Sequence, residues 1–130
     1  MAIVHAVIAL ALIQFFAFGI LVGRARAKYE IPAPAMAGHA IFERYFRVHY
    51  NTMEQLVVFI PGMLLFGLYI SAPAAAVLGL IFIVGRFVYL RAYIADPAKR
   101  GAGFGLTVLP VMILVLGGLG GALWAAFDPA

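Results

Sequence analysis

The sequence predicts an all-α integral membrane protein, a bundle of four membrane-spanning helices. Hydrophobic residues make up 66% of the 130 residues and charged residues 11%, whereas soluble domains are about half apolar. The mean hydropathy is +1.09. Four segments are long and apolar enough, at about 1.5 Å per residue, to cross about 30 Å of hydrocarbon. We therefore expect one transmembrane domain, covering residues 1–130, with little mass outside the bilayer.

The four helices are expected at about 2–23, 40–70, 74–95 and 97–127. The first is not a signal peptide by pattern, because no basic region precedes its apolar run and that run is too long. Pro32 and Pro34 predict an extended link after it, since proline lacks an amide hydrogen and biases the preceding residue away from the helix. Pro73 marks the turn between the second and third helices.

Two further prolines predict where the fourth helix begins and where it bends. Asp96 followed by Pro97 is typical of an N-cap and a first-turn proline, so a helix is expected to begin there. Pro110 lies inside the fourth span and should kink it. Two glycine pairs have the spacing that lets membrane helices approach closely; they are Gly19 with Gly23, and Gly117 with Gly121.

The basic residues predict the orientation in the membrane. All nine lie around two connections: Arg24, Arg26, Lys28, Arg44 and Arg47 at the first, and Arg86, Arg91, Lys99 and Arg100 at the third. By the positive-inside rule, both of these connections face the cytoplasm and both termini face the other side. The composition, rich in alanine and glycine and free of cysteine, suggests a bacterial inner membrane.

The net charge of +4 does not indicate a nucleic-acid partner, because it is gathered at one membrane face without an aromatic-interleaved soluble platform. Taken singly, Arg24, Lys28 and Lys99 are explained by orientation and by attraction to acidic lipid headgroups, so membrane lipids are expected partners. Without a cysteine the chain has no thiol of its own. Any sulfur chemistry would need a thiol from outside.

A polar stripe runs along the start of the second helix. Its members fall within an arc of about 100° at 100° per residue; they are Glu43, Arg44, Arg47, Asn51 and Glu54. His49 points to the opposite side, where it is expected to face lipid or to have no role. Glu54 is the deepest member, and a carboxylate inside the bilayer costs about 2.5 to 3.5 kcal/mol. It must therefore face a partner, a cavity or a ligand.

The third helix has a matching polar face. Arg86, Tyr89 and Tyr93 fall within an arc of about 60°, while Arg91 points away. If this face meets the stripe on the second helix, the two enclose a cleft near the cytoplasmic surface that suits a small zwitterion bearing carboxylates. The alternative is that arginines and glutamates simply neutralise each other and that the tyrosines are interfacial. The arginines outnumber the glutamates, which favours an anionic guest.

Two segments resemble a known family. "FERYFRVHYNTMEQ" followed by "GRFVYLRAYIADPAKRGAGF" is similar to the membrane-associated proteins in eicosanoid and glutathione metabolism, the MAPEG family, which includes the microsomal glutathione transferases and leukotriene C synthase. The F-E-R-x-x-R-x-x-x-N-x-x-E pattern is its specific part. The resemblance implies a homotrimer of four-helix subunits that binds glutathione between neighbours, with no metal, and conjugates it to lipophilic electrophiles from the bilayer.

The resemblance also implies site residues by position. Those that match glutathione-binding positions of the family are Arg26, Arg47, Asn51, Glu54, Gln55, Arg86, Tyr89 and Tyr93. Arg26 corresponds to an arginine that reaches a glutathione carboxylate from the end of the first helix. Gln55 stands where several transferases have a tyrosine, and its amide can still donate a hydrogen bond. Arg100 matches the arginine that stabilises the thiolate.

Elementary chemistry agrees with this role for Arg100. A thiol with a pKa of about 8.5 is mostly protonated at neutral pH, and the thiolate is the nucleophile. A guanidinium cannot act as a base, but in the first turn of a helix its charge and the helix dipole together favour the anion. The expected mechanism is electrostatic stabilisation of the thiolate, with the proton leaving to water.

The expected function is therefore a glutathione transferase that detoxifies lipophilic electrophiles, with peroxidase activity towards lipid hydroperoxides as a further activity to test. The alternative is a non-catalytic family member that binds a fatty acid or lipid and presents it to a partner. A transporter or channel component is the third candidate. It has little support, because the polar residues cluster at one end and do not line a path across the bilayer.

Overall fold

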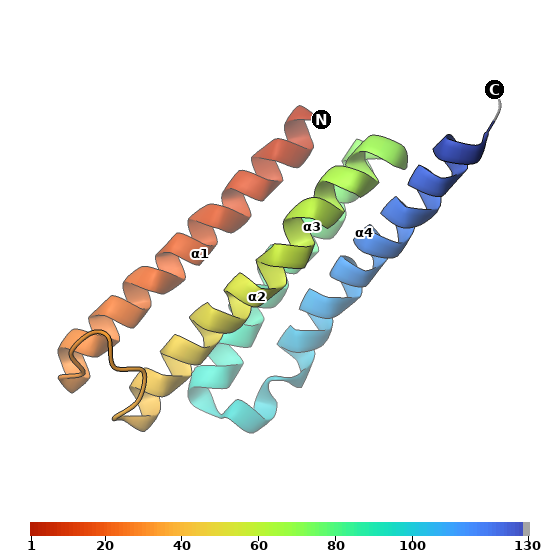
Figure 1. Cartoon of the computed structure of the whole chain (residues 1–130). Coiled ribbons are helices and arrows are strands. Elements are labelled where there is room, and N and C mark those ends of the chain that lie inside the picture. The colour runs from red at the N-terminus through yellow and green to blue at the C-terminus, as the bar shows by residue number, and fades with distance from the viewer. Residues whose placement is uncertain (129–130) are drawn as a thin grey trace.

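The computed structural model describes residues 1–128 and contains four long helices. They are α1 (Ala2–Tyr29), α2 (Ala40–Tyr69), α3 (Ala72–Ala95) and α4 (Gly101–Phe127), with a short 3-10 helix, η1 (Pro97–Lys99), before the last. The helices alternate in direction, so that the N-terminus, the α2–α3 turn and the end of α4 share one end of the bundle (Figure 1). Four helical segments are long and apolar enough to cross a membrane, which confirms the all-α membrane bundle.

The first helix extends beyond its apolar run. α1 continues through the basic residues to Tyr29, where Glu30 adopts a left-handed conformation (φ 57°) and its N–H bonds the carbonyl of Arg26. Arg26 and Lys28 lie in the last turn, where the helix dipole favours cations. With 28 residues the helix is about 42 Å long. Its last turns therefore stand beyond the hydrocarbon.

Asp96 caps the segment before the fourth helix, as predicted, but the fourth helix itself begins later than expected. The Asp96 carboxylate accepts a hydrogen bond from the N–H of Ala98 (3.1 Å). The short helix η1 comes next, and α4 begins only at Gly101, with Arg100 as its N-cap residue. α4 then continues as helix through Pro110. Arg100 thus lies at a junction between two helical segments.

The main core lies in the half of the bundle that contains the two termini. Its residues come from all four helices, and the rings of Phe59 and Phe82 stack at its centre with centroids 3.9 Å apart. Val4 and Leu114 complete it without exposed surface. In a bilayer such packing contributes through van der Waals contact, since lipid tails are as apolar as the side chains.

Glycines let the helices approach closely at the other end. A β-carbon at Gly85 would lie 2.8 Å from the carbonyl carbon of Leu106, and one at Gly103 would meet the backbone of Tyr89. α3 and α4 are therefore in backbone contact beside Tyr89. Of the predicted glycine pairs, three members lie against side chains of the same chain, whereas a β-carbon added at Gly23 would meet no atom of another described segment within 4 Å.

Replacing Gly103 with alanine should overpack this contact and lower the stability by about 1–3 kcal/mol, because the opposing atoms are backbone and cannot swing away. The matched control is Gly105→Ala on the same helix, where nothing lies within 4 Å. We expect a lower thermal unfolding midpoint in detergent for the first variant and an unchanged or slightly higher one for the second. Equal midpoints would contradict the close α3–α4 approach.

Candidate functional site

A buried arginine joins three helices at the centre of the candidate site. Arg86 of α3 has no exposed surface. Its Nη2 donates to Asn51 Oδ1 (2.9 Å) and to Thr52 Oγ1 (2.9 Å), both on α2. Its Nη1 donates to Thr107 Oγ1 of α4 (3.2 Å). Because a charge in the membrane interior must be compensated, these bonds fix the relative positions of α2, α3 and α4.

The partners of Arg86 are neutral oxygens, and two of them, the threonine hydroxyls, are themselves anchored. The hydroxyl of Thr52 donates to the carbonyl of Val48 (2.7 Å), and that of Thr107 donates to the carbonyl of Gly103 (2.9 Å). Each hydroxyl therefore presents lone pairs to the guanidinium. Within the described residues, the buried Nε of Arg86 has no hydrogen-bond partner. Arg86 thus faces the bundle interior, which fits a positioning role better than contact with a ligand.

Two tyrosines extend this cluster along α3. The guanidinium carbon of Arg86 lies 4.4 Å from the ring centroid of Tyr89, and the rings of Tyr89 and Tyr93 stack with centroids 5.5 Å apart. Tyr89 is buried and Tyr93 half-buried. The structure therefore brings the three residues of the expected third-helix face into one cluster.

The outward face of α2 remains open in the single chain. Arg47 and Glu54 are exposed, and Asn51 and Gln55 are half-buried. Arg47 lines a cavity of about 430 Å³, whose other lining residues are Met36, Glu43, Phe46 and Tyr50. These expected glutathione contacts lie along one helix face, and only Asn51 among them reaches the Arg86 cluster.

Arg100 lies outside that cavity. It is exposed, its Nη1 donates to the carbonyl of Pro97 (2.9 Å), and it lines a separate cavity of about 380 Å³ with Ala98, Gly101 and Phe104. Arg47 and Arg100 therefore line different cavities of the chain.

Arg26 lies apart from the cluster and organises the link between α1 and α2. Its Nη1 donates to the carbonyl of Ala35 (2.6 Å), and its guanidinium carbon lies 4.8 Å from the ring centroid of Phe42. This fixes the link that contains Pro32 and Pro34. The link is non-helical as predicted, but it is not extended throughout, because the chain turns at residues 33–34 and the N–H of Ala35 donates to the carbonyl of Pro32 (3.0 Å). In the single chain the structure does not bring Arg26 to the other site residues.

Three supporting residues were not expected from the sequence in these roles. Thr52 and Thr107 hold Arg86, and Arg44 donates to the carbonyls of Ile94 (2.8 Å) and Ala95 (3.4 Å). Arg44 thereby satisfies carbonyls that the end of α3 would leave without partners. A lone threonine inside an apolar span is a usable signal, but its partner depends on which helices are neighbours.

His49 is on the side opposite the stripe, as predicted, but the expectation that it faces lipid is wrong. Its ring stacks on Phe15 of α1 with centroids 4.4 Å apart and planes 12° apart. Gly19 leaves room for the imidazole, which would lie 3.2 Å from a β-carbon there. The helix that covers this side of α2 is α1, so the histidine packs within the bundle.

The fold and the buried polar cluster define an integral multi-pass membrane protein of the four-helix class. The profile of the MAPEG family matches residues 3–120, and the chain belongs to this family.

Three relatives illustrate the relationship. The chain is 47% identical over 116 residues to an uncharacterised protein of Synechocystis sp., covering 89% of this chain and 85% of that protein. It is 38% identical over 104 residues to microsomal glutathione S-transferase 2 of Homo sapiens, covering 79% and 71%. It is 30% identical over 114 residues to leukotriene C4 synthase of Bos taurus, covering 87% and 75%.

Proposed function

We propose that the protein is a membrane-bound glutathione transferase that conjugates the glutathione thiolate to lipophilic electrophiles reached through the bilayer. The observation that supports this most directly is the open face of α2, which leaves Arg47, Asn51 and Glu54 accessible inside a membrane-spanning helix. Charged groups there are costly unless a partner or ligand covers them. The kinship with microsomal glutathione S-transferase 2 supports glutathione as that ligand.

A second copy of the chain is part of this proposal. Glu54 is exposed near the middle of α2, and lipid cannot solvate its carboxylate. Arg47 and Arg100 line separate cavities. A neighbouring subunit packed on α2 would cover Glu54 and supply the missing half of the site. We propose the homotrimer that the family resemblance implies, with glutathione between neighbouring subunits.

Each side chain then has a chemical task. Arg47 and Arg26 would bind glutathione carboxylates, and Glu54 would bind its ammonium group. Further hydrogen bonds would come from Asn51, Gln55, Tyr89 and Tyr93. Arg86 would hold Asn51 and Tyr89 in place. Arg100, from the neighbouring subunit, would stabilise the thiolate that attacks the electrophile, while the thiol proton leaves to water.

The direct test is to add glutathione to the detergent-purified protein and to measure thiolate absorbance, conjugation of a small aryl halide and reduction of a lipid hydroperoxide. We expect bound thiolate at neutral pH and turnover of the halide. Peroxide reduction reports whether the second activity is present. If the wild-type protein bound no glutathione, the enzyme proposal would fail, and the alternative of a lipid-binding family member would replace it.

Glu54→Gln should raise the KM for glutathione about 10- to 100-fold, the range of a lost hydrogen bond to a charged group. The absorbance of the thiolate at saturation should change little, because Glu54 is assigned to the ammonium end. Glu43→Gln is the comparison variant: Glu43 is also exposed on α2 and lines the cavity of Arg47, but its Oε2 already accepts from the N–H of Gly38 (3.3 Å), so the KM should change less. Lost thiolate absorbance with normal KM would mean that the two ends of glutathione are assigned in reverse.

A further inference from the structure

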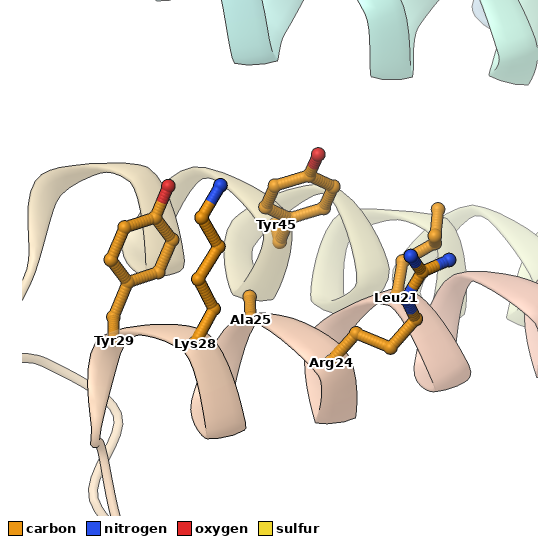
Figure 2. A pocket seen from close by; sticks show the side chains of 6 residues that line it. All are labelled: Leu21, Arg24, Ala25, Lys28, Tyr29 and Tyr45. Atoms are coloured by element: carbon orange, nitrogen blue, oxygen red, sulfur yellow. The ribbon is translucent and has the colours of Figure 1, made fainter.

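A basic pocket lies beside the C-terminal end of α1, and none of its lining residues belongs to the proposed glutathione site. Its volume is about 290 Å³, and it is lined by Leu21, Arg24, Ala25, Lys28, Tyr29 and Tyr45. Figure 2 shows the side chains of Lys28 and Tyr29 from α1 and of Tyr45 from α2 extending to the same side, away from the α1 axis. The lining thus combines two cations with two phenols, and none of the six residues is acidic.

The charges in this pocket are arranged for an anion. Arg24 and Lys28 are one helical turn apart, so both project from the same face of α1. The Lys28 ammonium lies 5.4 Å from the ring centroid of Tyr29, and the ring of His39 stacks on Tyr29 with centroids 3.8 Å apart. An anion in the pocket would pair with the two cations and accept hydrogen bonds from the phenols.

The depth of the pocket matches the phosphates of a bilayer. α1 has 28 residues and spans about 42 Å, whereas the hydrocarbon is about 30 Å thick. The predicted span ends near residue 23, so Arg24 and Lys28 stand at headgroup level. The space is equivalent to about ten water molecules at roughly 30 Å³ each, which is enough for a headgroup that keeps part of its hydration.

The floor of the pocket favours a lipid over a free anion. Leu21 lies one turn below Arg24, towards the membrane interior, and packs on the buried cluster of Phe18, Val48 and Tyr89. Below Arg24, on the same face of α1 by helical spacing, the large apolar side chains of Ile20, Ile13 and Leu10 are exposed. A cationic rim above a continuous apolar wall suits an amphiphile with one anionic headgroup.

We propose that this pocket binds the phosphodiester of an anionic phospholipid. Arg24 and Lys28 pair with the phosphate oxygens, Tyr29 and Tyr45 donate hydrogen bonds to it, and an acyl chain descends along Leu21. This site is independent of the proposed function, because it uses none of the residues assigned to glutathione.

The test is native mass spectrometry of the full chain, delipidated in detergent and then given equal amounts of phosphatidylglycerol and phosphatidylcholine. Wild type should retain phosphatidylglycerol in preference. The double variant Arg24→Gln/Lys28→Gln should retain about tenfold less phosphatidylglycerol than wild type, or less still. The matched control, Arg91→Gln/Lys99→Gln, removes the same charges from exposed positions outside the pocket and should keep it.

If the double variant folds poorly, a second variant that leaves both charges in place still tests the proposal. Tyr45→Phe removes one hydroxyl and should lower phosphatidylglycerol retention severalfold with normal helix content by circular dichroism. Equal losses in both double variants would overturn the proposal in favour of diffuse attraction at the membrane face. Equal retention of phosphatidylcholine would overturn it too. Displacement of phosphatidylglycerol by inorganic phosphate would show a free-anion site instead of a lipid site.

Discussion

Arg100→Ala is expected to lower the turnover number for aryl halide conjugation about 100- to 1000-fold, the usual effect of losing one group that stabilises a developing anion. Binding of glutathione should weaken much less, because Arg47, Glu54 and Asn51 are assigned to the rest of the molecule. The loss should be largest at neutral pH, where an unassisted thiol with a pKa of about 8.5 is mostly protonated.

The activity of Arg100→Ala should depend on pH in a direction that follows from the positive charge of Arg100. A cation next to the sulfur favours the thiolate and lowers the thiol pKa, so removing Arg100 raises that pKa towards its ordinary value. The variant should therefore regain activity as the pH increases through that range, and its thiolate absorbance should appear at higher pH than in wild type. Lys99→Ala, which removes the adjacent exposed cation, is the control and should keep the wild-type profile. A normal profile for Arg100→Ala would remove Arg100 from the chemical step.

Arg86→Met should lower kcat/KM about a hundredfold, although Arg86 is not expected to touch glutathione. The guanidinium holds Asn51 and lies on the ring of Tyr89, and small displacements of positioning groups can cost about that much in rate. The change in stability should be modest. Hydrogen bonds between membrane helices are worth about 0.6 kcal/mol on average, and removing a buried charge offsets part of their loss.

A conservative variant separates position from charge. Arg86→Lys keeps the cation, but one ammonium cannot reproduce the planar fork that reaches α2 and α4 together and stacks on Tyr89. We expect it to be nearly as impaired as Arg86→Met. Arg91→Met, on the same helix but exposed, is the control and should be active. Full activity of Arg86→Lys would show that only the charge matters, and a collapse of the thermal midpoint for Arg86→Met would show that its role is mainly structural.

Much of the fold follows from periodicity and length. Apolar runs of spanning length predict four helices, and the Asp96–Pro97 pair predicts a cap that the structure contains. The ends are less predictable, since α1 continues through Arg26 and Lys28 to a left-handed residue at Glu30. A hydropathy window detects where the hydrocarbon ends, whereas the helix itself ends where its last carbonyls find partners.

The sequence predicts which helix faces carry the residues of the candidate site, but it does not predict how deeply those residues are buried. Helical spacing places Arg86, Tyr89 and Tyr93 on one face, and the structure shows them in contact. The same spacing could not reveal that Arg86 is fully buried among neutral hydroxyls, because that depends on Thr107 of α4 reaching it across the bundle. The expectation that His49 faces lipid was wrong for the same reason, since a helical wheel for one helix does not show which neighbouring helix covers each side.

The contact between Gly103 and the backbone of Tyr89 fixes more than packing density. It sets the register of α4 on α3, and Arg100 lies three residues before it along the chain. One residue inserted between them would turn Arg100 by about 100° around the helix and shift it by about 1.5 Å. Sequence length in this segment is therefore under a geometric constraint, and insertions that any other surface turn would absorb are excluded here.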